Sequence, residues 1–234
     1  MKFQAPLLEG ILVERYKRFL ADIRLSSGEM VTAHCPNSGS MMGLKDTGNS
    51  VRLSVSTNPK RKLKYTWEMV KSDGVWVGIN TNYPTRLVAE SFQLGQIPEF
   101  VPYQSLRREV TSGNSRLDLY FTGAHRALWV ELKNVTLVSR GIAQFPDAAT
   151  TRGQKHVREL TELCRRGERA AILFVIQRED VECFTPADAI DPEFGRLLRK
   201  AAQQGVSILA YSWIVTPEAI RLLRKVPVDL SEPG

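Results

Sequence analysis

Short apolar runs separated by turn residues fill the first 80 positions of the chain. Ser27-Gly28 and Asp73-Gly74 are strong turn signals between such runs. Short strands joined by tight turns are typical of a small barrel or sandwich, and an OB-type barrel is the simplest arrangement. The runs that we expect to form the strands are 11–25, 30–35, 51–56, 65–71 and 75–79.

The pattern changes after a connector that contains Pro84, Pro98 and Pro102. Strands and helices then alternate, which indicates an α/β domain. Asp191-Pro192 predicts the start of one helix and Gly205 its end. Strands are expected over 116–121, 127–133, 170–176 and 206–213, and helices over 105–110, 152–164, 191–205 and from Thr216-Pro217 onward.

These patterns predict two domains. Residues 1–84 would form the OB-like, nucleic-acid-binding domain, and residues 85–234 the α/β domain, with 85–102 as its connector. The composition, 43% hydrophobic and 24% charged, is that of a globular protein. No apolar run is long enough for a membrane span, and the first ten residues do not resemble a signal peptide, so we expect a cytoplasmic protein.

The three cysteines and the charge distribution narrow the class of protein and its expected partner further. Cys35, Cys164 and Cys183 are too scattered for a disulfide framework or a zinc knuckle. Of the net charge of +7, residues 1–84 carry +5, from 12 Lys and Arg against 7 Asp and Glu. A basic surface attracts polyanions by releasing counterions from phosphates, so nucleic acid is the expected partner, with a solvated positive surface as the alternative.

Basic and aromatic side chains alternate within the predicted barrel. OB-type surfaces use such pairs to hold a backbone by charge while bases stack on rings. His34 and Asn37, at the end of a predicted strand, form a polar cluster that either contacts nucleic acid or caps a long loop. The other candidates for nucleic-acid binding in this domain are Arg15, Lys17, Arg18, Phe19, Arg61, Lys62 and Lys64.

Candidate catalytic chemistry lies on two predicted strands of the second domain. The strand period of two places Glu131 and Lys133 on one face, and Asp118 is far enough upstream to return on the neighbouring strand. Two close carboxylates repel unless a cation such as Mg²⁺ or Mn²⁺ lies between them. Asp118 and Glu131 are therefore the predicted metal ligands, and Glu109, at the end of the expected 105–110 helix, is a further candidate ligand. Lys133 would either hold the attacking water or stabilise the charge that develops on the phosphate. The alternative is a solvated strand face with ordinary ion pairs.

The start of the 152–164 helix carries a second polar group. A helix N-terminus suits phosphate, and Arg152, Gln154, Lys155 and His156 lie there, so we expect them to contact the nucleic-acid backbone. A solvated basic face is the alternative. A lone histidine more often satisfies a local hydrogen bond than performs catalysis.

Several long motifs occur in an order that resembles the sugar fermentation stimulation protein A family. The resemblance runs from about residue 3 to about residue 225. The motifs are Arg15-Tyr16-Lys17-Arg18-Phe19-Leu20-Ala21-Asp22, His34-Cys35-Pro36-Asn37, Ser115-Arg116-Leu117-Asp118, Val130-Glu131-Leu132-Lys133-Asn134-Val135-Thr136-Leu137 and the stretch from Phe145-Pro146-Asp147-Ala148 to Arg152-Gly153-Gln154-Lys155-His156.

The resemblance implies an N-terminal OB-like domain and a C-terminal domain of the PD-(D/E)xK nuclease type. It also implies sequence-nonspecific DNA binding and a regulatory link to sugar (maltose) metabolism. By the family pattern Asp118 and Glu131 would be metal ligands, Lys133 the catalytic lysine and Glu109 a further acid, and Arg116 joins the candidates for DNA contact.

Three functions are left open by the sequence. The first is a DNA-binding protein with a metal-dependent phosphodiesterase site, and the second is a DNA-binding regulator that has lost turnover. Intact Asp118, Glu131 and Lys133 favour the first, because acids facing DNA weaken simple binding. The third, an unrelated sugar-pathway enzyme, lacks a Gly-rich phosphate loop, a Gly-x-Ser-x-Gly elbow and a dinucleotide fingerprint. The oligomeric state is undetermined, and a homodimer is compatible with the sequence.

Overall fold

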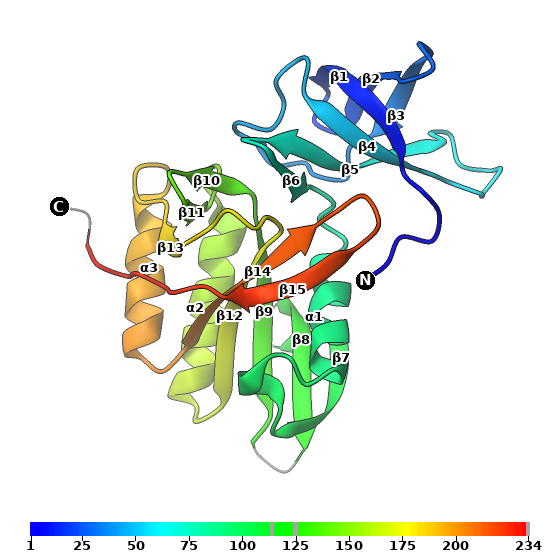
Figure 1. The fold of residues 1–234 in the computed structure, drawn as a ribbon. Helices are drawn as coiled ribbons and strands as arrows, with labels where there is room; N and C mark the ends of the chain where they lie inside the picture. Colours follow the sequence, from blue (N-terminus) through cyan, green and yellow to red (C-terminus); the bar gives the residue numbers. More distant parts are fainter. Residues whose placement is uncertain (113–114, 124–125, 233–234) are drawn as a thin grey trace.

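A closed five-stranded barrel forms the N-terminal part of the protein (Figure 1). The computed structural model describes residues 1–112, 115–123 and 126–232. The sheet order β3-β2-β1-β4-β5, closed by a parallel pairing of β3 with β5, confirms the predicted OB-like barrel. The strands are β1 (Leu8–Tyr16), β2 (Leu20–Leu25), β3 (Met30–His34), β4 (Ser50–Val55) and β5 (Tyr65–Ser72), and β6 (Val75–Gly78) extends the sheet beyond β5.

The run expected as one element over 11–25 is two strands. The chain reverses at Lys17 and Arg18, whose φ angles of 48° and 64° lie in the left-handed region. Glycine or asparagine usually takes this conformation, so two basic residues gave no turn signal. The turn carries Lys17, Arg18 and Phe19 outward from the barrel, where all three are exposed.

A six-stranded mixed sheet forms the centre of the second domain. Its order is β15-β14-β12-β9-β8-β7, in which β9, β12 and β14 are parallel. The strands are β7 (Tyr103–Ser112), β8 (Ser115–Gly123), β9 (Leu128–Val135), β12 (Arg169–Ile176), β14 (Ser207–Val215) and β15 (Ile220–Lys225). A small sheet of β10 (Leu137–Ser139), β11 (Ile142–Phe145) and β13 (Cys183–Pro186) lies beside it, and η1 (Pro98–Phe100) precedes β7.

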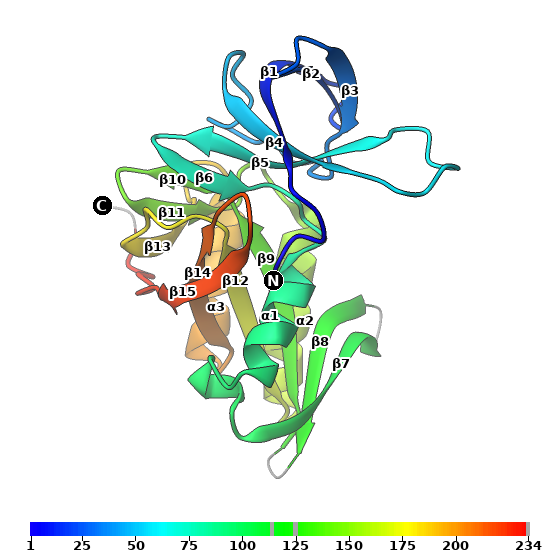
Figure 2. The same cartoon turned by 45° about the vertical axis from the view of Figure 1, so that its right-hand side comes forward.

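Helices cover the two faces of the central sheet. α1 (Pro84–Gln93) packs on one face, and α2 (Thr151–Arg165) and α3 (Pro192–Gln203) on the other (Figures 1 and 2). Neighbouring residues of β12 therefore enter different cores, with Leu173 on the α1 side and Ile172 on the α2 side. Asp191 begins α3 by accepting a hydrogen bond from the Phe194 N–H (2.9 Å), as its sequence predicted.

Two expected helices are strands. Residues 105–110 belong to β7, whose polar side chains are exposed because it is the edge strand of the sheet. The segment after Thr216 is the hairpin strand β15. There the Thr216 hydroxyl accepts from the N–H groups of Glu218 and Ala219, which makes a tight turn instead of a helix cap. In both segments pairing with a neighbouring strand outweighs the local helical preference.

The barrel and the second domain share several contacts. The amino group of Met1 donates to the carbonyl oxygen of Ile220 (2.7 Å), and Met69 of β5 lies in the α1-side core. At Gly78 the N–H donates to the carbonyl of Gln177 (2.9 Å), and a Cβ there would come within 2.6 Å of the Gln177 Oε1. Glycine leaves room for the Gln177 side chain at this contact, and a larger residue would force that side chain to move.

Asp147, in the loop before α2, connects the second domain to a barrel loop. Its carboxylate accepts hydrogen bonds from the Ser40 hydroxyl (3.0 Å) and the Met41 N–H (3.1 Å). Asp147→Ala is expected to lower the free energy of unfolding by about 1–3 kcal/mol, because both donors lose a charged acceptor. Asp147→Asn keeps one acceptor oxygen and should cost less, as urea denaturation can measure. Equal losses in the two variants would contradict this role.

Candidate active site

Asp118 and Glu131 lie on neighbouring antiparallel strands near the middle of the sheet. The β8–β9 pairing ends at Leu119 and Val130, so the next position on each strand is Asp118 and Glu131. The paired ladder stops there, and the Asp118 carboxylate accepts the free Leu132 N–H at 2.8 Å. A side chain thus replaces a strand partner at this point of β9.

The inward and outward alternation of β8 breaks at Asp118. Leu119 packs in the α1-side core, as its neighbour Val130 does, but Leu117 packs in the α2-side core. Residues two apart on a regular strand share a face. The break aims the Asp118 carboxylate along the sheet toward β9, which explains its bond to the Leu132 backbone.

Glu131, Lys133 and His156 form one buried cluster. The Lys133 Nζ donates to Glu131 Oε1 at 2.7 Å and lies 3.4 Å from His156 Nδ1. His156 Nδ1 also forms a hydrogen bond with Glu131 Oε1. The side chains of Glu131 and Lys133 are 4% and 10% exposed, so the ion pair between them is largely desolvated. Because the ionised Glu131 carboxylate can only accept, the His156 imidazole donates from Nδ1 and carries its proton there.

The first turn of α2 positions His156. Thr150 caps the helix by accepting from the Gly153 N–H (3.0 Å), and a Cβ at Gly153 would approach the Thr150 methyl group to 2.7 Å. Asp191 accepts from the Thr150 N–H and the Gln154 side chain, both at 2.9 Å, while also capping α3. The two helix starts are thereby tied together, and His156 is directed from α2 onto β9.

The two acids have opposite pKa shifts. Burial raises the pKa of Asp118 to about 6, and the negative charge of Glu131 adds to the shift; the Leu132 N–H, Lys133 and His156 oppose it without cancelling it. Burial also disfavours ionised Glu131, but hydrogen bonds from His156 and Lys133, with their charges, outweigh it and bring the pKa of Glu131 below its ordinary value. One carboxyl is therefore held ionised while the other titrates near neutrality.

The residues fit a divalent cation with oxygen ligands. Glu131 Oε2 is buried and has no hydrogen-bond partner among the described residues, which is costly unless a ligand occupies it. A cation between Asp118 and Glu131 would satisfy this oxygen and relieve the repulsion that raises the pKa of Asp118. Across residues 1–112, 115–123 and 126–232 no group of three or more His, Cys, Asp or Glu could hold a metal, so ligands of other kinds would complete the shell around these two carboxylates.

Glu109 is not at a helix end. It lies on β7 with a φ of 53°, and its side chain is 62% exposed. Its carboxylate is 3.4 Å from Arg116, which is 64% exposed. By register Glu109 lies across from Asp118, so both strands are irregular at the level of the site. A left-handed conformation at a non-glycine residue is strained, which suggests a conformational role for this position.

The predicted nucleic-acid-binding residues of the barrel fall into two groups. Arg15 points inward, and its Nη2 donates to the carbonyls of Arg18, Asn37 and Gly39. Asn37 is 5% exposed, and burial followed by the charge of Arg61 lowers the pKa of His34. The exposed group is Lys17, Arg18, Phe19, Arg61, Lys62 and Lys64.

The predicted contacts on α2 are likewise divided. Arg152 and Lys155 are exposed, but Gln154 is bound to Asp191, and His156 is buried on Glu131. Sequence reasoning missed this pairing of His156 with the acid. It also missed Tyr120 and Trp129, which neighbour the acids; the alternation that joined Glu131 to Lys133 could have included Trp129.

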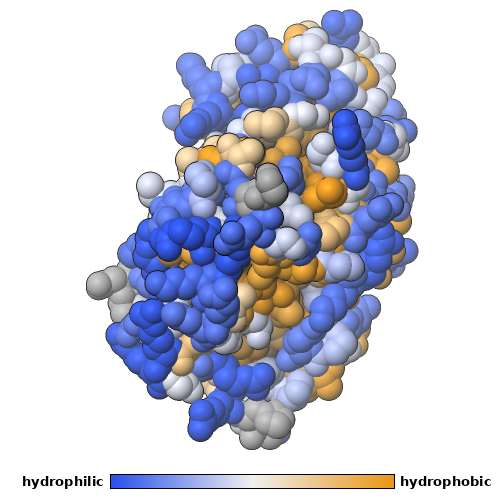
Figure 3. Space-filling model, turned by 90° about the vertical axis from the view of Figure 1, so that its left-hand side faces the viewer, coloured by the Kyte–Doolittle hydropathy of each residue, from blue (hydrophilic) through white to orange (hydrophobic). Residues whose placement is uncertain are grey.

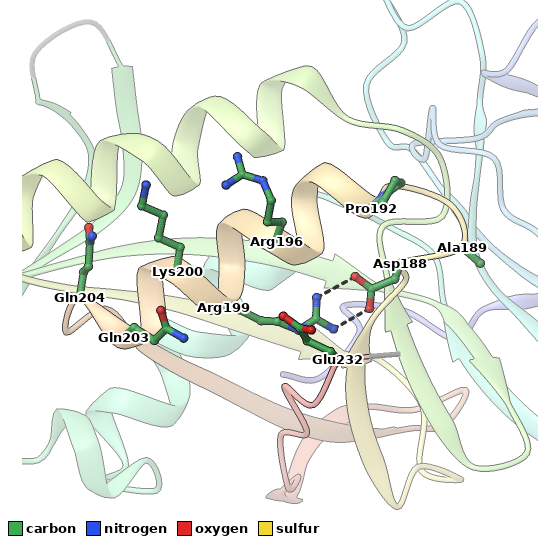
Figure 4. Close-up of a pocket in the computed structure, with 9 residues that line it drawn as sticks. All are labelled: Asp188, Ala189, Pro192, Arg196, Arg199, Lys200, Gln203, Gln204 and Glu232. Carbon is green, nitrogen blue, oxygen red and sulfur yellow. Dashed lines mark hydrogen bonds and ion pairs between the residues drawn. The ribbon is translucent and has the colours of Figure 1, made fainter. Parts of the chain in front are cut away.

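A pocket beside α3 lies away from this cluster (Figure 4). Its Arg199 forms two hydrogen bonds with the Asp188 carboxylate (2.8 and 2.6 Å) and donates to the carbonyls of Leu230 and Ser231. This arginine is therefore used to fix the C-terminal segment. The surface seen from the α3 side is largely hydrophilic, with apolar atoms in a central patch (Figure 3). No helix within the described ranges is long and apolar enough to cross a membrane.

Comparison with known proteins gives the same domain order. Residues 13–79 match the SfsA N-terminal OB domain, and residues 82–219 match the sugar fermentation stimulation protein RE domain. The sugar fermentation stimulation protein homolog of Geobacter sulfurreducens is 57% identical over 228 residues, which cover 97% of this chain and 98% of the relative. The homolog of Maricaulis maris is 50% identical over 235 residues, covering 99% and 100%.

A solved structure agrees over the whole chain. Pyrococcus furiosus SfsA, determined in complex with Ca²⁺, has a TM-score of 0.90 and 26% sequence identity, and the match covers 98% of each chain. The predicted fold, an OB-like barrel followed by a PD-(D/E)xK nuclease-like α/β domain, is confirmed. The chain belongs to the sugar fermentation stimulation protein A family.

Proposed function

We propose that the protein is a metal-dependent phosphodiesterase that acts on nucleic acid, most simply DNA without sequence preference. The observation that carries the proposal is that Glu131 Oε2 is buried without a hydrogen-bond partner among the described residues. Beside it lies Asp118, and burial and the charge of Glu131 raise the pKa of Asp118. The two acids repel each other and lie beside a desolvated lysine. This arrangement is better suited to a site that binds a cation and a phosphate than to a surface that only binds nucleic acid.

Asp118 and Glu131 would hold the divalent cation. When bound, such an ion polarises a phosphodiester and lowers the pKa of a coordinated water. Mg²⁺ or Mn²⁺ is our expectation, and the Ca²⁺ complex of the Pyrococcus furiosus relative supports an oxygen-ligand cation in this family. Mg²⁺, Mn²⁺ and Ca²⁺ all prefer carboxylate oxygens as ligands.

Lys133 is the proposed charge-stabilising residue. Its ammonium group lies 2.7 Å from Glu131 and is almost fully desolvated, so its charge acts strongly on a phosphate brought to the acids. His156 is a positioning residue: its bond to Glu131 fixes the carboxylate oxygen that faces Lys133 and leaves the other oxygen for a ligand. Glu109 is exposed and paired with Arg116, and among the described residues no contact assigns it a chemical step.

The barrel is proposed to hold the nucleic-acid backbone. Six exposed residues, five of them cations, occupy the β1–β2 turn and the segment before β5, and they supply counterion release without base readout. Residues 1–84 would then bind the nucleic acid and residues 85–234 would cleave it. Arg116, Arg152 and Lys155 would be further cationic contacts with its backbone. A link to sugar (maltose) metabolism would follow from action on nucleic acid.

Cleavage of labelled single- and double-stranded DNA in Mg²⁺ or Mn²⁺ tests this function. We expect cleavage by the wild type and only the metal-free level in Glu131→Gln, because the amide cannot hold the cation as a carboxylate does. The matched control is Glu193→Gln, a surface acid paired with Arg158 and Arg196. DNA binding by the wild type without metal-dependent cleavage would reject turnover and favour a DNA-binding regulator on the same fold.

A further inference from the structure

An aromatic pair lies on the same sheet face as Glu131. Trp129 is two residues before Glu131 on β9, and Tyr120 is its partner across β8. Their ring centroids are 4.2 Å apart with planes inclined at 44°. Because residues two apart on a strand are separated by about 7 Å, the rings begin roughly one nucleotide's length from the acids.

This pair is not part of a filled core. Trp129 packs at the margin of the α2-side core, but Tyr120 belongs to none of the three cores that the described residues form. Both side chains are half-buried. In Figure 2, β7 and β8 lie to the side of the helices. A ring that fills no core is available to a ligand.

Opposite charges flank the aromatic pair: Arg107 lies on the Tyr120 side, and on the Trp129 side the Glu168 carboxylate accepts a hydrogen bond from the indole N–H at 3.4 Å. Arg107 of β7 is the register partner of Tyr120 and is exposed, with no ion pair to any described residue. Glu131 is covered by His156 and Lys133, whereas Asp118 is only half-buried, so the acids are most accessible from the β8 side. A phosphate that reaches them from this side brings its neighbouring base over the rings.

We propose that Tyr120 and Trp129 form a stacking subsite for an unpaired base of the nucleic-acid substrate, with Arg107 beside the adjoining phosphate. The inference rests on the proposed function and specifies its substrate class. In a duplex each base is stacked between its neighbours, so its face is not free for Tyr120. The substrate at the acids is therefore a single strand or a frayed end. Aromatic stacking tolerates any base, which agrees with binding that is not sequence-specific.

Two substitutions at Tyr120 separate stacking from packing. Tyr120→Phe keeps the ring, whereas Tyr120→Leu keeps an apolar side chain against Trp129 without an aromatic face. We would measure the Kd of the full-length protein for a labelled oligothymidine strand and for a duplex of equal length, with chelator present to prevent cleavage. Tyr120→Leu should weaken strand binding about tenfold and duplex binding less than about twofold, and Tyr120→Phe should bind as the wild type does.

Thermal unfolding of each variant shows whether it folds. If Tyr120→Leu does not fold, Arg107→Gln at an exposed edge position provides the second test: the slope of log affinity against log salt for the strand should fall by about 1. Unchanged strand binding by folded Tyr120→Leu, or equal losses for strand and duplex, would overturn the subsite.

The cleavage assay keeps the two proposals distinguishable. Metal-dependent cleavage by the wild type together with normal strand binding by Tyr120→Leu would retain the phosphodiesterase and reject the subsite. Tyr120-dependent strand binding without cleavage would support the subsite and reject the phosphodiesterase.

Discussion

Replacing Lys133 by methionine is expected to lower the free energy of unfolding by about 3–5 kcal/mol when no divalent metal is present. Methionine retains the length and apolar stem of the side chain but removes the charge that lies 2.7 Å from Glu131. The Glu131 carboxylate, 4% exposed, would be left with His156 as its remaining donor. A buried charge that loses its partner carries most of its desolvation cost unrelieved.

Urea denaturation of a double-mutant cycle measures this coupling. Glu131→Gln in the Lys133→Met background should recover most of the loss, because the neutral pair leaves no buried charge. Arg158→Met is the matched control: it breaks an ion pair with Glu193 whose side chains are 52% and 37% exposed, so we expect a change below about 1 kcal/mol. A loss for Lys133→Met no larger than this control would show that the buried pair is not formed.

The alternation of Glu131 and Lys133 was sufficient to predict their common face. Strand geometry repeats every two residues whatever the surroundings are, and the β9 register agrees with the prediction. The start of α3 was equally predictable, because Asp191-Pro192 combines a capping carboxylate with a residue suited to the first helical turn. Such features depend only on residues close together in sequence.

The edge strand β7 was beyond such reasoning. Residues 105–110 include two arginines and a glutamate, which favour helix locally, and they form a strand because β8 offers a hydrogen-bonding edge. Glu109 therefore moved from an expected helix end to an exposed strand position. Lys17 and Arg18 show the same limit, since their left-handed turn is imposed by the pairing of β1 with β2.

Contacts between distant segments account for the rest of the site. His156 meets Glu131 because Asp191 holds the start of α2 against that of α3, and no spacing along the chain indicates this arrangement. The break in alternation at Asp118 depends on two cores that only the folded sheet separates. Asp118 and Glu131, brought together from two strands, thus create the repulsion that a cation relieves, while His156 from α2 favours the ionised form of Glu131.

Asp118→Asn is expected to stabilise the metal-free protein at pH 8 by up to about 3 kcal/mol. The pKa of Asp118 is about 6 in the folded protein against an ordinary 3.8. A raised carboxyl pKa means that the unfolded chain releases its proton first, so wild-type stability falls as pH rises from about 4 to 6 and stays low above that. Asparagine cannot ionise, and its oxygen can still accept the Leu132 N–H.

Urea denaturation at pH 4 and pH 8, in chelator and then in excess Mg²⁺, separates this effect from a change in packing. Near pH 4 the folded wild type has a neutral carboxyl, so the two proteins should differ little in stability. At pH 8 Mg²⁺ should stabilise the wild type and leave Asp118→Asn nearly unchanged, because binding to the folded state alone is what raises stability. The same stability difference at both pH values would mean that Asp118 is not strained by its charge, and the case for a cation beside Glu131 would lose its electrostatic support.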